Sequence, residues 1–111
     1  MDCIFCKIVH KEIPGKIVKE TDRIVAFYDI APQAPVHILI IPKKHMAGIG
    51  DMTRDDRALI GDLFYEAGLI ARELKIRDYR LVINNGKEAG QAVFHLHLHL
   101  LAGRKFAWPP G

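Results

Sequence analysis

The stretch FHLHLHLLAG, residues 94–103, places His95, His97 and His99 at every second position, with leucines between them. Side chains of an extended strand point alternately to its two faces. The alternation therefore predicts a half-buried strand over residues 93–101, with the three imidazoles on one face and a core on the other. The residues expected on the core face are Phe94, Leu96, Leu98 and Leu100.

Three alternating histidines allow three interpretations. They can be the polar face of an edge strand, or they can converge on a metal such as zinc. In the third interpretation one imidazole is a nucleophile that the other two orient, because histidine titrates near neutral pH and its nitrogen can attack phosphorus. The preceding loop NGKEAGQA, residues 85–92, favours this interpretation. Its Gly86 and Gly90 leave backbone N–H groups open to a phosphate.

Length and composition limit the classes of protein to consider. The chain has 111 residues, 50% of them hydrophobic and 26% charged, and a formal net charge of +3 with histidines neutral. We expect a single domain, residues 1–111, with one core. The modest charge suits a small anionic ligand and does not indicate a nucleic-acid partner. Because no segment resembles a signal peptide or a membrane helix, we expect a cytoplasmic protein without a membrane partner.

The remaining segments predict an α+β fold with an antiparallel five-stranded sheet, because strands and helices do not alternate. The expected strands are residues 16–20, 23–30, 36–42, 79–84 and 93–101, with Thr21 and Asp22 in the first hairpin turn. A short helix is expected over residues 3–12. A long helix is expected after Thr53, its N-cap, with Asp55 and Asp56 in its first turn, and it runs to about residue 75. Its expected apolar face is Leu59, Ile60, Leu63, Phe64, Ala67, Ile70, Ala71 and Leu74.

HLHLHLL, with YDIAPQAPVHILIIPKKH (residues 28–45) and the ending WPPG, resembles the histidine triad family and its nucleotide-binding (Hint) branch. The similarity runs from CIFCKI, residues 3–8, to the last residue. Members of this branch are homodimers that bind purine nucleoside monophosphates and hydrolyse the P–N bond of nucleoside phosphoramidates, AMP-lysine-like compounds among them. The resemblance therefore implies a dimeric hydrolase that needs no cofactor for catalysis.

The resemblance also implies a role for each catalytic histidine. His97 would attack the α-phosphorus and form a nucleotidyl-histidine intermediate, which water then cleaves. His99 would contact a non-bridging oxygen and help to protonate the leaving amine. His95 and His37 would sit behind His97 and tune its tautomer. Without the resemblance, His37 is an ordinary polar residue at the start of a strand.

The nucleotide-binding residues follow from the same resemblance. Asp29 would hold the ribose hydroxyls, although a turn-capping role is the ordinary one for an aspartate there. The base slot would be formed by Phe5, Ile8, Phe27 and Ile30, which could equally be plain core residues. Asn84, Gly90, Gln91 and Val93 would line the phosphate, beside His97 and His99. Trp108 of one subunit would reach toward the site of the other.

The chain departs from the family pattern at two positions, and two functions other than phosphoramidate hydrolysis stay open. Animal members have serine where this chain has Ala92, and Ala107 lacks the matched polar contact before Trp108. One rival is a non-catalytic purine mononucleotide-binding or regulatory protein. The other is a dinucleoside polyphosphate hydrolase, although such relatives typically replace the last histidine, here His99, by glutamine.

Cys3 and Cys6 form a C-x-x-C pair near the N-terminus. With His45 and His95 as third and fourth ligands they would complete a closed Cys₂His₂ zinc site. Such a zinc would be structural: it would tie the first helix to the sheet and remove His95 from proton transfer. The alternative is a reduced pair packed as small hydrophobic residues. A redox pair is disfavoured because no thioredoxin-like βαβ pattern surrounds it.

Overall fold

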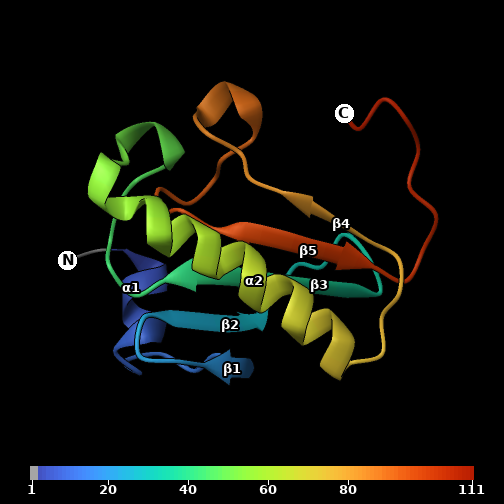
Figure 1. The fold of residues 1–111 in the computed structure, drawn as a ribbon, viewed down its shortest axis with the longest axis horizontal. Coiled ribbons are helices and arrows are strands. Elements are labelled where there is room, and N and C mark those ends of the chain that lie inside the picture. Colours follow the sequence, from blue (N-terminus) through green and yellow to red (C-terminus); the bar gives the residue numbers. More distant parts are fainter. Residues whose placement is uncertain (1–2) are drawn as a thin grey trace.

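An antiparallel sheet of five strands forms the centre of the protein (Figure 1). The structure, a computed structural model, describes residues 3–111. Its strands are β1 (Ile17–Glu20), β2 (Ile24–Tyr28), β3 (Val36–Pro42), β4 (Tyr79–Val82) and β5 (Leu98–Ala102). They lie in the order β1-β2-β3-β5-β4, and each neighbouring pair is antiparallel. The predicted α+β class is confirmed.

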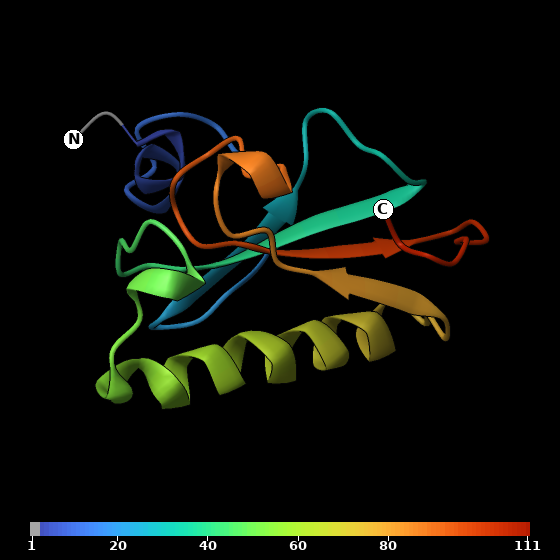
Figure 2. The same cartoon turned by 90° about the horizontal axis from the view of Figure 1, so that it is seen from above.

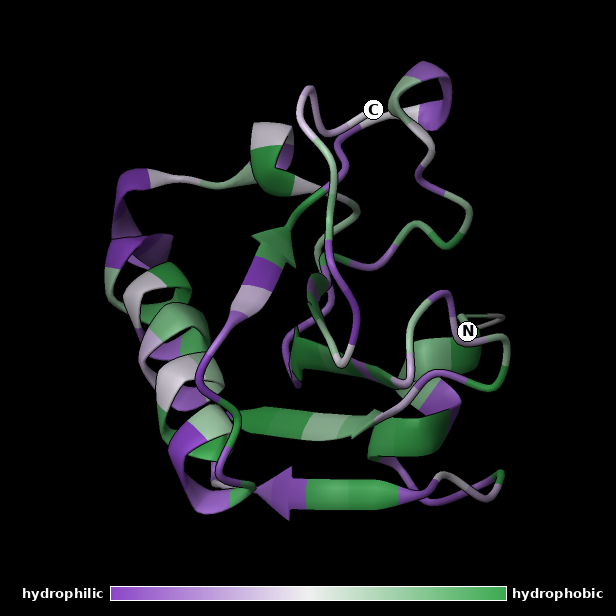
Figure 3. Ribbon diagram, turned by 90° about the vertical axis from the view of Figure 1, so that its right-hand side faces the viewer, coloured by the Kyte–Doolittle hydropathy of each residue, from purple (hydrophilic) through white to green (hydrophobic). Residues whose placement is uncertain are grey.

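The two faces of the sheet carry different elements (Figure 2). The long helix α2 (Arg57–Glu73) packs on one face, whereas the short helix α1 (Ile4–Val9) and the loop between β4 and β5 lie on the other. Figure 3 shows hydrophobic residues concentrated in the central strands, whereas α2 alternates between hydrophobic and hydrophilic residues. Among the described residues, no helix has the length and apolar character needed to cross a bilayer.

The central strand β3 contributes to both cores because its side chains alternate between the two faces. Ile38 and Ile40 pack in the cluster that includes α2, whereas Leu39 and Ile41 pack in the cluster that includes Phe5 of α1. All four strand residues are at most 4% exposed. The prediction of a buried strand over residues 36–42 is therefore confirmed, and its Leu39 and Ile41 are part of the core on the α1 side.

The first hairpin has its turn where the sequence predicts it. Thr21 Oγ1 accepts hydrogen bonds from the N–H groups of Arg23 (3.3 Å) and Ile24 (3.1 Å). The second strand, predicted to reach residue 30, ends at Tyr28. It ends there because Asp29 Oδ1 accepts from the N–H of Ala31 (2.9 Å) and folds the chain into a turn.

The long helix differs from its prediction at the start and at two apolar positions. A 3₁₀ turn, Arg54–Asp56, comes first, and the Asp56 carboxylate accepts from the backbone N–H of Thr53 at 2.9 Å. Phe64 and Leu74, expected in the core, are 44% and 41% exposed. Phe64 lies about 100° around the helix from the buried Leu63, and Leu74 lies past the last helical residue. The buried stripe of α2 is Leu59, Leu63, Ala67, Ile70 and Ala71.

The first helix is shorter than the predicted span of residues 3–12. Cys3 is its N-cap, and Cys3 Sγ accepts from the N–H of Cys6 at 3.4 Å. The helix ends at Val9, and Lys11 then takes a φ of 60°, a left-handed conformation that does not continue a helix. The cysteine pair therefore occupies the first turn of α1, on the side that faces the sheet.

The strand predicted over residues 93–101 begins only at Leu98, so His95 and His97 precede it. The pairing of β3 with β5 joins Ile40 to Leu98 and goes no further. Pro42 has no N–H to donate to a neighbouring strand. Its carbonyl oxygen accepts a hydrogen bond from the ring of His95 and not from a backbone N–H of the segment before β5. Phe94, expected in the core, is 50% exposed. The buried positions of Leu96, Leu98 and Leu100 are confirmed.

Candidate active site

His97 presents one ring nitrogen with a lone pair. Its Nδ1 lies 2.7 Å from the backbone carbonyl oxygen of His95, which can only accept a hydrogen bond. Nδ1 therefore carries the ring proton, and in the neutral ring the lone pair is on Nε2. The imidazole is 7% exposed, and the ring of Phe5 packs edge-on against it at a centroid distance of 5.1 Å. This arrangement holds the His97 ring in one orientation, with Nε2 as the nitrogen that carries no proton.

His99 presents the complementary group, an N–H donor. The N–H of Gln33 donates to His37 Nδ1 (3.0 Å), which places the proton of the neutral His37 ring on Nε2. His37 Nε2 then donates to His99 Nδ1 (2.8 Å), so the proton of His99 is on Nε2. His99 Nε2 is buried and has no hydrogen-bond partner among the described residues. With the His97 and His99 ring centroids 4.8 Å apart, a lone pair and an N–H donor lie side by side.

Burial favours the neutral forms of the His99 and His37 rings. It lowers the pKa of His99 to about 4, and the nearby His97 and His37 rings add to this effect. Burial also lowers the pKa of His37, against the opposing charge of Asp29. An anion beside His99 would act in the opposite direction, because negative charge stabilises the cationic form of an imidazole.

The Asp29 carboxylate contacts both the turn that follows β2 and the ring of His37. Its Oδ1 caps the turn to Ala31, and its Oδ2 lies 3.5 Å from His37 Nε2. His95 was expected, with His37, to sit behind His97 and tune its tautomer, and it bonds the His97 ring through its backbone carbonyl while its own ring bonds Pro42. The ring of His37 bonds His99, so its effect on His97 stays a prediction.

The loop between β4 and β5, residues 84–93, is here called the glycine loop. Gly86 and Gly90 have φ values of 96° and 99°, which glycine adopts without strain. A Cβ at Gly90 would lie 3.7 Å from Asn84 Nδ2, so these two predicted phosphate-lining residues are neighbours. Gln91 differs from its prediction as a nucleotide contact. It is 4% exposed, and both ends of its amide bond the protein backbone.

The predicted base slot is only partly assembled. Phe5, Ile8 and Phe27 pack in one buried cluster, with Val93 at its edge. The Phe5 and Phe27 rings meet edge-on at 5.4 Å. Ile30 stands apart from them and is 96% exposed, because it follows the turn at Asp29. The structure thus brings three of the four predicted residues together, in the core role that the sequence also allowed.

Cys3, Cys6, His45 and His95 form a cluster whose four ligand atoms all lie within 4.8 Å of one another. The His45 and His95 Nδ1 atoms are 3.2 Å apart. Cys6 Sγ lies 3.3 Å from His45 Nδ1 and 3.6 Å from His95 Nδ1, and Cys3 Sγ lies 3.4 Å from His95 Nδ1. A tetrahedral zinc with Zn–N of about 2.0 Å and Zn–S of about 2.3 Å separates nitrogen pairs by about 3.3 Å and nitrogen–sulfur pairs by about 3.5 Å. The cluster therefore has the dimensions of a zinc site.

The protonation of His95 also suits a metal. Its Nε2 donates to the carbonyl oxygen of Pro42 (2.8 Å), which leaves the lone pair on Nδ1, facing the thiols. Burial lowers the pKa of His95 and raises the pKa of Cys6. A bound cation would reverse the second effect, because it stabilises the thiolate. The donor set and the tautomer both fit a metal ion.

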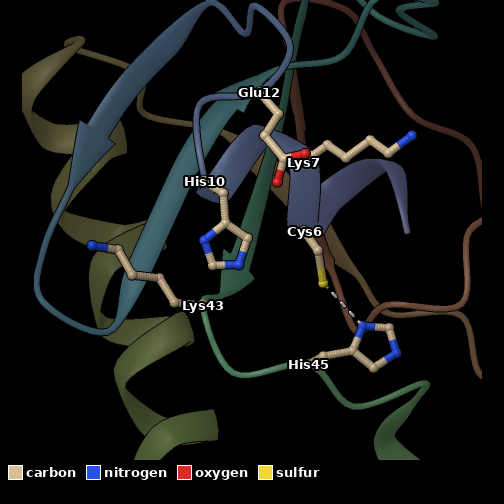
Figure 4. A pocket seen from close by; sticks show the side chains of 6 residues that line it. All are labelled: Cys6, Lys7, His10, Glu12, Lys43 and His45. Atoms are coloured by element: carbon tan, nitrogen blue, oxygen red, sulfur yellow. Dashed lines mark hydrogen bonds between the residues drawn. The ribbon is translucent and has the colours of Figure 1, made fainter. Parts of the chain in front are cut away.

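A cavity of about 440 Å³ opens beside this cluster. Figure 4 shows Cys6 and His45 at one end of it, with Lys43 and His10 at the other. The cavity thus borders the Cys/His cluster and is not lined by His97 or His99. His45 is the exposed member of the cluster, so this is the side from which solvent reaches it.

Three functional groups of the site have no sequence pattern. They are the N–H of Gln33, the carbonyl of Pro42 and the carbonyl of His95, and each sets the tautomer of one histidine. Nearly every residue carries the same backbone groups, so only the fold identifies the ones that matter. Trp108, predicted to reach a partner subunit, is 82% exposed.

Comparison with known proteins agrees with this geometry. The family model described as HIT domain matches residues 10–106. A HIT-like protein of Synechocystis sp. is 56% identical over 99% of this chain and 97% of its own length. The "14 kDa zinc-binding protein" of Brassica juncea is 45% identical over 99% of this chain and 100% of its own length. The crystal structure of a HIT family hydrolase from Legionella pneumophila has a TM-score of 0.96 and 49% identity, covering 99% of this chain and 100% of that one. The chain belongs to the HIT domain family.

Proposed function

We propose that the protein is a purine nucleoside phosphoramidase, which hydrolyses the P–N bond of adenosine 5′-phosphoramidates such as AMP-lysine. The observation that carries this proposal is that the His97 lone pair lies beside the buried N–H of His99, which has no hydrogen-bond partner within residues 3–111. A P–N bond needs both groups, because its amine is a poor leaving group until it is protonated. HIT family hydrolases among the structural neighbours support a hydrolase in general.

In the first step, His97 Nε2 attacks the α-phosphorus and forms a new P–N bond. The bond to the amine breaks, and its electron pair stays with the amine nitrogen. The His37–His99 pair takes up one proton when the anionic phosphate binds, because the phosphate and Asp29 favour the cationic form. His99 Nε2 delivers this proton to the departing amine.

In the second step, water attacks the nucleotidyl-His97 intermediate. The bond from phosphorus to Nε2 breaks and its electron pair returns to the imidazole, while His99 Nε2 accepts a proton from the water. The hydrogen bond from His97 Nδ1 to the carbonyl of His95 holds the ring in place through both steps. The products are AMP and the free amine, and when AMP leaves, the His37–His99 pair releases the proton that it took up.

We assign the binding of the nucleotide to groups around the two reacting rings. The Asp29 carboxylate, 20% exposed, would accept hydrogen bonds from the ribose hydroxyls. Backbone N–H groups of the glycine loop, with Asn84, would hold the phosphate. The base would contact Phe5, Ile8 and Phe27 from outside, with Ile30 closing over it from the Asp29 turn.

The experiment supplies the purified protein with adenosine 5′-phosphoramidate, an AMP-lysine analogue and a dinucleoside polyphosphate. Release of AMP from the first two, abolished in His97→Asn, supports the proposal. Faster release from the dinucleoside polyphosphate would favour the polyphosphate hydrolase. Binding of AMP without turnover of any substrate would favour a regulatory nucleotide-binding protein.

We further propose that Cys3, Cys6, His45 and His95 hold a structural zinc. The carrying observation is the match of their separations to a tetrahedral site. The zinc would join α1 to the chain after β3 and to the segment that precedes β5. It would supply no chemistry to the reaction. Metal analysis of protein purified without chelator tests this, and fewer than a few tenths of an equivalent would contradict it. Thiol ligands also fit a reducing compartment such as the cytoplasm.

We also propose a homodimer. Phe64, Tyr65 and Tyr79 are 44%, 61% and 37% exposed on α2 and β4, and β4 is an edge strand of the sheet. A second copy pairing along this surface would cover the side chains and the strand edge together. Sedimentation at micromolar concentration tests this proposal, and a monomer there would contradict it.

A further inference from the structure

We propose that Gln91 is a positioning residue that couples the Cys/His cluster to the glycine loop, so that a metal in the cluster tightens the binding of a nucleotide phosphate. The inference rests on the proposed nucleotide and zinc sites and adds a link between them. It follows from three sets of contacts between the glycine loop and the chain that follows β3.

The side chain of Gln91 closes the glycine loop and ties it to a second segment. Its Oε1 accepts from the N–H of Gly86 (2.8 Å), across the loop. Its Nε2 donates to the carbonyl oxygens of Val93 (3.1 Å), within the loop, and Ala47 (2.6 Å), outside it. The residue is 4% exposed, so these bonds are shielded from water. Losing them would leave buried backbone groups without partners.

The second segment, residues 45–50, lies close against the glycine loop. The N–H of Gly50 donates to Asn85 Oδ1 at 2.8 Å. A Cβ at Gly48 would lie 2.5 Å from Asn85 Oδ1 and 3.4 Å from Gln91 Oε1, so a larger residue there would displace the Asn85 side chain. The Gln91 and Asn85 contacts therefore hold the two segments together.

The same two segments are joined again at the cluster. Segment 45–50 begins at the ligand His45, and the ligand His95 follows the glycine loop two residues after Val93. The N–H of Leu96 donates to the carbonyl oxygen of Met46 (2.8 Å) beside the two ligands. A metal that binds both imidazoles thus joins the two segments at the Cys/His cluster, and Gln91 joins them at a second place. The two connections close a ring of contacts.

This ring makes the two binding events interdependent. Fixing His45 against His95 restricts segment 45–50, and through Gln91 it restricts the backbone N–H groups that would face a phosphate. A nucleotide then binds to a loop that is already ordered, which lowers the entropy cost of binding. The coupling is reciprocal, so a nucleotide must tighten metal binding by the same factor.

The experiment measures AMP affinity by calorimetry in the zinc-loaded and the chelator-stripped protein, for the wild type, Gln91→Met and Gln91→Glu. Gln91→Glu keeps an acceptor for the N–H of Gly86 but cannot donate to Ala47 or Val93. We expect zinc to tighten AMP binding about fivefold in the wild type, and less than twofold in both variants. Amide exchange of residues 84–93 should slow on zinc binding in the wild type alone.

Thr21→Val is the matched control, since it removes side chain–backbone hydrogen bonds from the β1–β2 turn and should leave the zinc effect on AMP affinity intact. Equal AMP affinities of the zinc-loaded and stripped wild type would overturn the coupling. So would a zinc-dependent gain in AMP affinity that is as large in both Gln91 variants as in the wild type. Neither result would contradict the proposed zinc site or nucleotide site. Zinc that does not bind the wild type overturns the metal site, and AMP that binds neither form overturns the nucleotide site. In both cases the coupling is lost with the site.

Discussion

Replacing His99 by glutamine separates proton delivery from the positioning of the phosphate. Glutamine keeps an N–H donor but cannot transfer a proton at neutral pH. In the structure His99 is fixed by the 2.8 Å bond from His37, with its ring 4.8 Å from that of His97, so it is already placed for transfer. A general acid held in this way contributes about 10²- to 10⁴-fold to the rate. We therefore expect His99→Gln to lower the turnover of an AMP–alkylamine substrate by about 10³-fold.

The informative assay compares two leaving groups. The p-nitrophenyl ester of AMP releases a phenolate that needs no proton, so the rate of its first step, measured as phenolate released in a single turnover, should fall less than about tenfold, the value of one lost hydrogen bond. The second step is left out of the comparison, because there His99 accepts a proton from water whichever group has departed. The same substitution at an exposed residue, His10→Gln, controls for general effects of replacing histidine. An equal loss of the first-step rate with both substrates would refute the role of His99 as the proton donor.

Three further predictions concern stability, the metal and the core. Because burial lowers the pKa of His99 from 6.5 to about 4 in the folded protein, the unfolded chain binds the proton more readily. The free energy of unfolding should therefore fall as the pH drops from 6.5 toward 4, and urea titrations should show a shallower fall in His99→Gln. Chelation of the metal should lower the melting temperature of the wild type and have no effect on Cys3→Ser/Cys6→Ser; equal melting curves for the wild type with and without chelator would contradict the site. Leu63→Ala removes a side chain that is 0% exposed under the sheet and should cost about 3 kcal/mol in urea unfolding, whereas a loss below about 1 kcal/mol would contradict the described core.

The fold could be predicted from the sequence where hydrophobic periodicity decides it. The run at residues 36–42 has enough β-branched residues to specify a buried strand, and its bounds are confirmed. The predicted strand boundaries were wrong where a side chain forms a hydrogen bond with a backbone group at the end of a strand. Asp29 shortens β2 in this way, and the carbonyl of Pro42, taken by the ring of His95, stops the pairing that would have extended β5.

Of the candidate site, the residue types could be predicted but several partners could not. Four metal-ligating residues were expected together, and the structure places them together although they come from three separate segments. The hydrogen bond from His37 to His99 was not predicted, because it joins residues 62 positions apart and depends on the register of β3 against β5. The resemblance led us to expect that Gln91 faces the nucleotide. A sequence cannot show which backbone groups will surround its amide, so its contacts with the backbone were not predicted.

The central claim is that His97 becomes covalently attached to the nucleotide. The direct measurement mixes the protein with adenosine 5′-phosphoramidate, stops the reaction within milliseconds in alkaline denaturant, and maps the adduct by mass spectrometry of peptides. We predict one nucleotidyl group on the peptide that contains residues 94–103, localised to His97 and missing in His97→Asn. Full AMP release with no adduct on His97 at any time, or with the adduct on another residue, would contradict the proposed mechanism.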